Sequence, residues 1–487
     1  MARAQVNSDH DGGADLYLEL APTGPRRAAL AAALREAVRS GRLAPGTRLP
    51  PYRALAVDLG VARNTVADAY AELVAEGWLT ARQGSGTRVA ERAAAVRHRA
   101  ARKAVGGQAA QATHNLRQGQ PDAASFPRTA WIASVRRAVV AAPTDAFGPG
   151  DPQGRPELRH ALADYLARVR GVRTAPEHIV VCSGFAHGLR LLFEGGVLPG
   201  PLAVEPYGLP FHRGILAHAG VRTVALGLDE RGARTDRLAV DPATTARHGP
   251  RSVLLTPAHQ FPVGGPLHSA RRSAAVDWAR TRAGVVLEDD YDGEFRYDRE
   301  PVGAIQGLDP EHVVYMGSAG KSLSPAIRLG WMALPPRLVD GVLAAKGLRE
   351  AWAGVGDQLA LADFIESGQY DAHIRRMRRR YRTRRAQLVA ALAERAPHIT
   401  VTGIAAGLHA VLRLPPGTEA PTVAAATRMG IALDGLALFR HPESPEPHVD
   451  GLVVGYATPP DHRYQAALDA LCLVLPPQPD PGTGGPA

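Results

Sequence analysis

Two short stretches in the second half of the chain carry the side chains best suited to chemistry. "VVLEDDYDGEFRYDREP" (285–301) places seven carboxylates and two tyrosines directly after a short apolar run. "YMGSAGKSLSPAIRLGW" (315–331) places a lysine in a loop of small residues after a second apolar run. Carboxylates at the end of a strand suit either a solvated loop or a site that positions a cation. The neighbouring lysine helps to distinguish the two.

Lysine is rare in this chain, which makes its position informative. Only Lys103, Lys321 and Lys346 occur among 57 basic residues, and arginine supplies the other 54. An arginine side chain keeps its proton, whereas a lysine amine can lose one and form a Schiff base. Lys321 alone follows an apolar run inside a Gly/Ser loop, 32 residues after Asp289. A surface lysine in a turn is the alternative at this point.

A pyridoxal phosphate site needs a lysine for the aldehyde, a carboxylate for the pyridinium nitrogen, a phenol for the ring oxygen and a cradle for the phosphate. Lys321, Asp289 and Tyr291 can supply the first three. Backbone amides at a strand-to-helix junction and an arginine can form the cradle, because helix N-termini attract anions and guanidinium binds phosphate with two hydrogen bonds. The candidates for the cradle are Ser183, Gly184, Phe185, Ser318 and Arg328.

These groups lie where apolar, strand-like runs alternate with helical stretches. The runs are 178–184, 201–206, 252–257, 284–290 and 312–318. Such alternation predicts an α/β fold with a mostly parallel sheet, in which ligands bind at the carboxyl ends of the strands. The predicted domain spans 118–475, and its last part, from about Pro336, is helix-rich and then α+β. The remaining carboxylates of 285–301 are predicted to make structural or loop contacts: Glu288, Asp290, Asp292, Glu294, Asp298 and Glu300.

The N-terminal part of the chain is strongly basic and predicts a separate module. Residues 23–103 contain 15 Lys/Arg and 6 Asp/Glu, within a chain of net charge +10. Apolar periodicity predicts helices over 25–41, 52–60 and 63–77, and 78–90 is typical of two strands around a glycine turn. Two helices with a tight turn and a following wing can place the second helix in a DNA major groove. A three-helix packing module with solvated arginines is the alternative.

The rest of the chain predicts connections and ends rather than further domains. Residues 91–117 are rich in Ala, Arg, Gly and Gln, which predicts a basic, flexible linker. Composition predicts disordered tails at 1–22 and 476–487. No stretch approaches the roughly 18–20 apolar residues of a membrane span, and no signal peptide is evident. Cys182 and Cys472 give neither a disulfide framework nor a metal cluster. We therefore expect a cytoplasmic protein without a membrane partner or a metal site.

The order of these motifs resembles that of the MocR/GabR regulators, which join a GntR-type winged helix, here 23–90, to a fold-type I aminotransferase domain. The matching segments run from Thr23 to about Leu475 and include "GSAGKSLSPAIRLGW" and "TPAHQFPVGGPL". The resemblance implies pyridoxal 5'-phosphate as the cofactor, held by the residues named above, with His259 and Gln260 close to it. It also implies a homodimer, because fold-type I sites form at a dimer interface.

The same resemblance implies that double-stranded operator DNA is a partner. It assigns the DNA contacts to Arg53, Arg63, Asn64, Thr65, Gly84, Gly86 and Thr87. Two serines that are usual in the family are replaced, by Pro51 before the second helix and by Ala62 before the recognition helix. A lost N-cap costs about 0.5–2 kcal/mol. Both changes weaken helix starts or phosphate contacts and keep the arginines that could read bases.

Departures in the aminotransferase-like domain bear on its activity. Pro149 replaces a tyrosine, Leu209 stands where an aromatic would stack on the cofactor ring, and Gly320 replaces the serine before the lysine. Gly451 and Leu452 occupy the region where aminotransferases carry an arginine that clamps the substrate carboxylate. Turnover needs the substrate held against the ring. The departures therefore favour sensing over catalysis.

Three functions compete on these grounds. The best supported is a transcription regulator that senses pyridoxal phosphate itself, as in the PdxR branch of the family, which controls vitamin B6 synthesis genes. A regulator that responds to an amino acid or amine through the bound cofactor is the first alternative. An active aminotransferase with an attached DNA-binding module is the second. An empty second domain would require the Lys-Asp-Tyr-Arg set to survive by chance.

Overall fold

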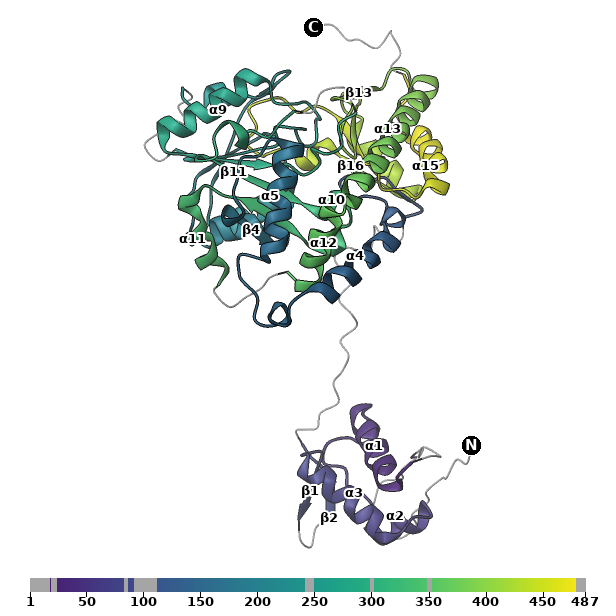
Figure 1. Cartoon of the computed structure of the whole chain (residues 1–487). Helices are drawn as coiled ribbons and strands as arrows, with labels where there is room; N and C mark the ends of the chain where they lie inside the picture. Colours follow the sequence, from purple (N-terminus) through teal and green to yellow (C-terminus); the bar gives the residue numbers. More distant parts are fainter. Residues whose placement is uncertain are drawn as a thin grey trace. The chain divides into compact units, whose positions relative to one another are not determined.

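The computed structural model describes residues 18, 24–82, 86–91, 112–240, 249–297, 302–347 and 353–478. The chain divides into two compact units, Met1–Gly107 and Gln108–Ala487 (Figure 1). The tails predicted at 1–22 and 476–487 and the linker predicted at 91–117 lie largely outside the described residues. Within the described ranges, no helix combines the length and apolar character needed to cross a membrane.

The N-terminal unit has three helices and a two-stranded wing, as its sequence predicts. The helices are α1 (Arg26–Arg39), α2 (Tyr52–Asp58) and α3 (Arg63–Ala75), and the antiparallel strands β1 (Leu79–Arg82) and β2 (Gly86–Val89) follow. Apolar side chains at helical spacing share one face of each helix, and these faces pack together. The core residues include Leu30, Leu34, Leu55, Val66, Tyr70 and Leu73.

Neither α2 nor α3 has a side-chain N-cap, which agrees with the two replaced serines. Pro51 and Ala62 precede these helices and make no capping hydrogen bond. Side-chain contacts connect α3 to α1: Arg35 of α1 donates hydrogen bonds to Glu72 and to Glu76, each at 2.6 Å. These contacts lie toward the end of α3, so its first turn is left free to face a partner.

A seven-stranded sheet forms the centre of the second unit. In spatial order its strands are β4 (Ile179–Cys182), β12 (Gly330–Ala333), β11 (Val313–Ser318), β10 (Val285–Asp289), β9 (Ser252–Leu255), β5 (Leu202–Val204) and β6 (Thr223–Ala225). Neighbours pair in parallel, except that β12 is antiparallel to both β11 and β4. The predicted mostly parallel sheet is confirmed, and each of the five predicted runs contains one strand. Strands β6 and β12 were not predicted.

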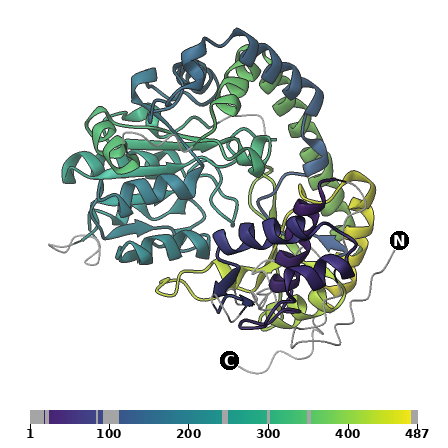
Figure 2. The same ribbon diagram turned by 90° about the horizontal axis from the view of Figure 1, so that it is seen from below.

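Helices cover both faces of this sheet (Figure 2), which explains why its strands are apolar on both sides. Every residue of β4 and of β12 is buried. Helix α4 packs against α12 at one side of the unit. The helices are α4 (Arg128–Ala141), α5 (Pro156–Arg170), α6 (Phe185–Leu189), α7 (Pro210–His218), α9 (Ser269–Arg282), α10 (Ala319–Ser322), α11 (Pro336–Lys346) and α12 (Val355–Glu366).

A smaller α+β part follows along the chain, as predicted. Its antiparallel strands lie in the order β13 (Thr400–Thr402), β14 (Ala410–Arg413), β17 (Gly451–Val454) and β16 (Asp434–Gly435), and its helices are α13 (Gln369–Arg395), α14 (Glu419–Arg428) and α15 (Asp461–Val474). The short strand β3 (His114–Asn115) pairs in parallel with β15 (Ile431–Ala432). The residues that follow 92–111 are therefore anchored to this smaller part.

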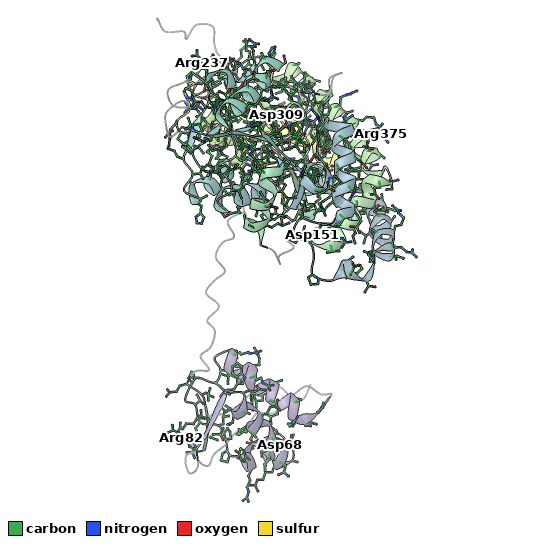
Figure 3. All side chains as sticks on the ribbon, turned by 60° about the vertical axis from the view of Figure 1, so that its left-hand side comes forward. Asp68, Arg82, Asp151, Arg237, Asp309 and Arg375 are labelled. Atoms are coloured by element: carbon green, nitrogen blue, oxygen red, sulfur yellow. The ribbon has the colours of Figure 1, made fainter. Side chains whose placement is uncertain are left out.

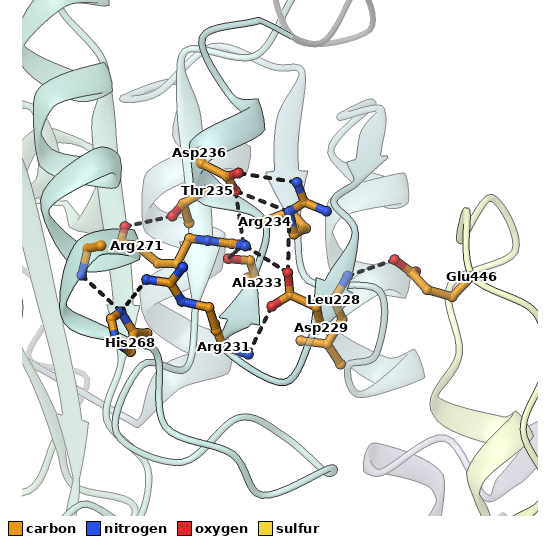
Figure 4. A network of polar contacts seen from close by, with 11 residues as sticks. Leu228, Asp229, Arg231, Ala233, Arg234, Thr235, Asp236, His268, Arg271 and Glu446 are labelled. Atoms are coloured by element: carbon orange, nitrogen blue, oxygen red, sulfur yellow. Dashed lines mark hydrogen bonds and ion pairs between the residues drawn. The ribbon is translucent and has the colours of Figure 1, made fainter.

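A polar network connects the hairpin β7 (Leu228–Asp229) and β8 (Gly232–Ala233) with α9 and with the smaller part (Figure 4). Asp229 accepts a hydrogen bond from Arg271 of α9 at 2.7 Å. The backbone N–H of Leu228 donates to Glu446, also at 2.7 Å. Because Glu446 precedes β17, this bond ties the smaller part to the sheet-containing part.

The carboxylates beside the end of β10 have structural partners, as predicted. Asp290 accepts two hydrogen bonds from the buried Arg170, at 2.6 and 3.1 Å. Glu288 accepts hydrogen bonds from two backbone amides, at 2.8 and 3.0 Å. Asp298 and Glu300 lie outside the described residues. Burial of Glu288 and Asp290 is tolerated because both carboxylates are hydrogen-bonded.

Candidate functional site

The predicted cofactor residues come together at one edge of the central sheet. Strands β4, β5, β9, β10 and β11 run in the same direction, so their carboxyl ends lie along this edge, and the antiparallel β12 begins there. Ser183 follows β4, Asp289 ends β10, and Ser318 ends β11. Arg328 lies just before β12, whose first residue, Gly330, is the register partner of Ser318. Ligands of open α/β sheets bind at this kind of edge.

A cavity of about 270 Å³ lies at this edge. Its volume is just below the roughly 300–1,000 Å³ of drug-sized ligand sites and suits a small ligand. Most of the predicted cofactor residues line it: Ser183, Gly184, Phe185, Asp289, Tyr291, Ser318, Lys321 and Arg328. The two others, His259 and Gln260, do not line it.

Lys321 reaches the cavity from α10, which directly follows β11. Its Nζ donates a hydrogen bond to the carbonyl oxygen of Gly119. Burial lowers the pKa of this amine, and the opposing effects of Asp289 and Asp292 are smaller. A lower pKa increases the fraction of neutral amine, which is the form that attacks an aldehyde. The environment of Lys321 thus supports the chemistry predicted for it.

Asp289, the last residue of β10, is partly buried and lines the cavity. Burial raises its pKa well above the ordinary value, the neighbouring Asp290 raises it further, and Lys321 opposes both effects. Among the described residues, no side-chain hydrogen bond to the Asp289 carboxyl is present. A pyridinium N–H would supply the missing donor and a positive charge, which would lower the pKa again. The carboxyl group therefore fits the nitrogen of a pyridine cofactor.

Arg328 and the start of α6 can form an anion site in the same cavity. Arg328 has a φ of 55°, a conformation uncommon for a residue with a Cβ. Its guanidinium makes no hydrogen bond or ion pair with another residue in the described part of the chain. Gly330 approaches so closely that a Cβ there would lie 2.5 Å from Cα of Gly184. Both Arg328 and the first turn of α6 line the cavity. The amides of His187 and Gly188 donate to the carbonyl of Gly184, which leaves the amides of Phe185 and Ala186 for an anion.

Tyr291 lines the cavity, but His259 engages its hydroxyl. The Tyr291 hydroxyl lies 3.0 Å from both the carbonyl oxygen and Nδ1 of His259. The same Nδ1 lies 2.9 Å from an oxygen of Asp292. Burial raises the pKa of the Tyr291 phenol well above its ordinary value, so it is a neutral donor. Its predicted contact with a cofactor ring oxygen requires this donor to turn away from His259.

His259 and Gln260 lie behind residues that line the cavity, and their expected nearness to the cofactor stays a prediction. Gln260 is 2% exposed. Its side chain donates to the carbonyl of Phe261 at 2.7 Å and accepts from the N–H of Val263 at 3.2 Å. These bonds fix the turn that carries Phe261 into the cavity wall. The two residues thus support the cavity-lining side chains of Tyr291 and Phe261.

Polar residues that sequence reasoning missed also line the cavity, among them Glu205, His212 and Arg213. Glu205 accepts a hydrogen bond from the hydroxyl of Thr256 at 2.5 Å, and burial raises its pKa to about 7. Glu205 could have been predicted from the sequence, because it is a carboxylate directly after an apolar run. His212 and Arg213 lie on α7, where nothing in their spacing indicates which face of the helix meets a cavity.

An apolar cluster closes one side of the cavity. Phe261 and Tyr207 line the cavity and pack with Val453 of β17 in this cluster. Gly451 and Leu452, the positions where the sequence lacked a carboxylate-binding arginine, do not line the cavity. The residue of β17 that faces this cluster is Val453, which is fully buried. Strand β17 thus presents an apolar residue, and no cation, to this cluster.

The predicted DNA-contacting residues differ in their exposure. Arg53, Arg63 and Asn64 are exposed, and Thr65 is partly exposed, in the first turns of α2 and α3. These positions are compatible with a recognition surface on α3. Arg82, at the end of β1, lies at the surface of the same unit (Figure 3).

Burial contradicts one predicted DNA contact in the wing, and the structure adds a pair of exposed arginines there. Thr87 is only 7% exposed, so its side chain faces the unit rather than a partner. Gly86 is exposed with a φ of 78°, and Gly84 lies outside the described residues. Arg48 and Arg88 are exposed and form a β-bridge beside the wing. Sequence reasoning missed this pair, because a bridge between residues 40 positions apart has no local signal.

Both units match known protein families. Residues 26–89 match the gntR family of bacterial regulatory proteins, and residues 113–442 match aminotransferase class I and II. The kynurenine aminotransferase of Pyrococcus horikoshii aligns with 74% of this chain and 90% of its own, with a TM-score of 0.66 and 23% identity. An archaeal alanine:glyoxylate aminotransferase aligns over the same shares, with a TM-score of 0.67 and 20% identity. These structures show the fold alone. The chain therefore combines a GntR-type DNA-binding domain with a fold-type I aminotransferase domain.

Relatives that align with most of this chain are regulators. The probable rhizopine catabolism regulatory protein MocR of Rhizobium meliloti is 32% identical over 446 residues, which cover 87% of this chain and 88% of the relative. The pyridoxine biosynthesis transcriptional regulator PdxR of Corynebacterium glutamicum is 33% identical over 402 residues, which cover 82% and 86%. The chain belongs to the MocR-type transcription regulators of the GntR family.

Proposed function

We propose that this regulator binds pyridoxal 5'-phosphate in the cavity, responds to it as an effector, and controls vitamin B6 synthesis genes. One observation carries the proposal: Lys321, Asp289 and Arg328 line a single cavity. In the described structure neither the Asp289 carboxyl nor the Arg328 guanidinium has a side-chain partner. An amine, an acceptor and an anion-binding cation match the aldehyde, ring nitrogen and phosphate of this cofactor. The relative named for pyridoxine biosynthesis supports the pathway.

Each group has a role set by its surroundings. Pyridoxal phosphate, when bound, supplies an aldehyde that condenses with a primary amine and a ring that withdraws electrons. The buried amine of Lys321 is the partner of the aldehyde, and Asp289 holds the proton of the ring nitrogen. Arg328, the hydroxyl of Ser318 and the first amides of α6 bind the phosphate.

The contact between Lys321 and Gly119 connects the cavity with the chain segment that precedes this domain in the sequence. Gly119 follows β3 in the segment that continues from residues 92–111. This segment is tied to the smaller part, since the N–H of Leu116 donates to Ala432 at 2.8 Å. A ligand that displaces Gly119 would move this segment. The effector shifts the balance of two arrangements only if it binds them with different affinity.

The proposal includes a homodimer. Ile132 and Val140 of α4 are 65% and 80% exposed, and Phe147, just beyond this helix, is 56% exposed. These side chains are available for contact with a second copy of the chain. Pairing of this surface with a second copy would present two winged helices to paired half-sites. A strictly monomeric protein at micromolar concentration that still binds the cofactor tightly would contradict this part.

The proposed function is tested by measuring operator affinity with and without pyridoxal phosphate. The operator is first located by footprinting the promoter of the protein's own gene. We expect the cofactor to change the dissociation constant by about 5- to 150-fold, the usual range of allosteric coupling. An unchanged dissociation constant, together with a strong response to one amino acid, would rule out cofactor sensing.

Arg213 favours a second candidate, a regulator that responds to an amino acid or amine. Its guanidinium lines the cavity and donates to the main-chain carbonyls of Gly208 and Phe439, at 2.7 and 3.0 Å. Burial lowers its pKa, and no carboxylate in the described residues pairs with it. A ligand carboxylate would provide such a pair. An amino-acid panel added to the cofactor-loaded protein, with Arg213→Gln as the comparison, tests this candidate.

A further inference from the structure

The cavity has no aromatic side chain at position 209, but it has one a single turn further along α7. Leu209 is the N-cap of this helix, and the N–H of His212 donates to its carbonyl at 3.0 Å. Side chains three positions apart share a face of a helix. Leu209 and His212 both line the cavity, whereas Phe211 and Gly214 do not. His212 therefore occupies the same wall, one turn deeper in the helix.

His212 packs as an aromatic ring. Its ring centroid is 4.7 Å from that of Phe185, with an interplanar angle of 47°. Phe185 is the first residue of α6, next to the predicted phosphate cradle. Neither ring nitrogen of His212 takes part in a hydrogen bond or ion pair with the described residues. Burial, with smaller effects from Lys321 and Arg213, lowers the pKa of His212 to about 4, so the ring is neutral near pH 7.

The other aromatic side chains that line the cavity belong to, or pack against, the apolar cluster that closes one side. Phe261 packs edge-on against Phe439, with centroids 5.3 Å apart, in the apolar cluster that closes one side. Tyr291 packs edge-on against Phe261, with centroids 5.9 Å apart, and its hydroxyl meets His259. The pair of Phe185 and His212 is the aromatic wall in the described cavity that lies outside this cluster.

We propose that His212, supported by Phe185, provides the face on which the pyridine ring stacks, in place of the aromatic side chain absent at position 209. The inference rests on the proposed function, because it assumes pyridoxal phosphate in this cavity. Flat rings gain from offset or edge-to-face contact beyond the burial of their area. The contact is with the face of the ring, so it acts on any phosphorylated pyridine of this shape, with or without an aldehyde.

The test uses the full-length protein and pyridoxine 5'-phosphate, which keeps the ring and phosphate but cannot form a covalent link to Lys321. Calorimetry gives its affinity for wild type, His212→Ala and His212→Phe. We expect His212→Ala to bind roughly tenfold more weakly and His212→Phe to bind within about threefold of wild type. His218→Ala is the matched control, because His218 is an exposed histidine on the same helix. Thermal unfolding without ligand checks that each variant is folded.

The outcomes separate this inference from the proposed function. Wild-type affinity in His212→Ala would overturn the stacking role. Weak binding by His212→Phe with near-normal binding by His212→Gln would also overturn it, because a hydrogen bond rather than the ring would then be responsible. If folded wild type binds neither pyridoxine phosphate nor pyridoxal phosphate, the cofactor site itself is wrong. Binding of pyridoxal phosphate with unchanged affinity in every variant would leave the cofactor site intact and reject only the stacking.

Discussion

The amine of Lys321 contacts the carbonyl oxygen of Gly119, although 202 positions separate the two residues in the chain. Gly119 has a φ of 79°, and a Cβ there would lie 3.0 Å from Nζ of Lys321. If this amine condensed with an aldehyde, two hydrogens would leave Nζ in the released water, and the hydrogen bond to this carbonyl would be weakened or lost. The same atom that would bind the cofactor thus holds the segment that leads toward the DNA-binding unit.

The first prediction concerns this contact. Gly119→Ala should reduce the difference in operator affinity between the cofactor-free and cofactor-loaded protein by about 1 kcal/mol or more, because the contact is already disturbed before the cofactor binds. Titration of operator DNA in both states measures this difference. Gly417→Ala is the matched control, since Gly417 has the same φ of 79° but no atom within 4 Å of an added Cβ. An equal loss in both variants would point to backbone strain instead.

The second prediction concerns the covalent site. The purified protein incubated with pyridoxal phosphate should show a visible absorption band that borohydride removes, and peptide mapping should then find the added mass on Lys321. Lys321→Ala should bind the cofactor weakly and show no such band. Lys346→Met serves as the control, because Lys346 is also buried but lies outside the cavity. An unchanged spectrum in Lys321→Ala would falsify the assignment.

The third prediction concerns DNA recognition. Arg63 is exposed in the first turn of α3, so Arg63→Ala should cost roughly 1–3 kcal/mol and relax the sequence preference if it reads a base edge. Arg48→Ala, beside the wing, should instead lower affinity for all sequences alike and reduce the salt slope by about 1. Competition with specific and unrelated DNA at several salt concentrations separates the two. Unchanged operator affinity in Arg63→Ala would remove α3 as the reading helix.

The fourth prediction concerns pH. Burial raises the pKa of Glu205 from 4.5 to about 7 in the folded protein. Below pH 4.5 the group is protonated in both folded and unfolded states and has no effect. Between pH 4.5 and 7 only the folded state keeps the proton, so stability falls as pH rises. Glu205→Gln should therefore stabilise the cofactor-free protein by up to about 3 kcal/mol above pH 7 and not below pH 4.5.

Denaturant unfolding at several pH values measures the difference between Glu205→Gln and wild type. Glu177→Gln is the control, because Glu177 is an exposed carboxylate of the same unit and its loss should not change the profile. A gain that is equal at pH 4 and pH 8 would show that packing, and not ionisation, is responsible.

Residue chemistry and local periodicity identified the main parts of this protein. Lys321 and Asp289 were recognisable because each follows a short apolar run, and such runs form strands that end at one edge of a parallel sheet. The three helices and the wing of the N-terminal unit follow from spacing alone. The family resemblance supplied the roles of several residues, and the relatives confirm the family but not these roles.

Contacts between distant segments were decided only by the tertiary structure. The contact of Gly119 with Lys321 and the pairing of Phe185 with His212 could not be predicted from the sequence. Spacing along the chain does not determine which helices and loops lie next to one another in the fold. The family resemblance assigned a DNA contact to Thr87, whose side chain is buried in the folded unit. Side-chain type and periodicity are local properties, whereas burial and pKa depend on which surfaces the folded chain brings together.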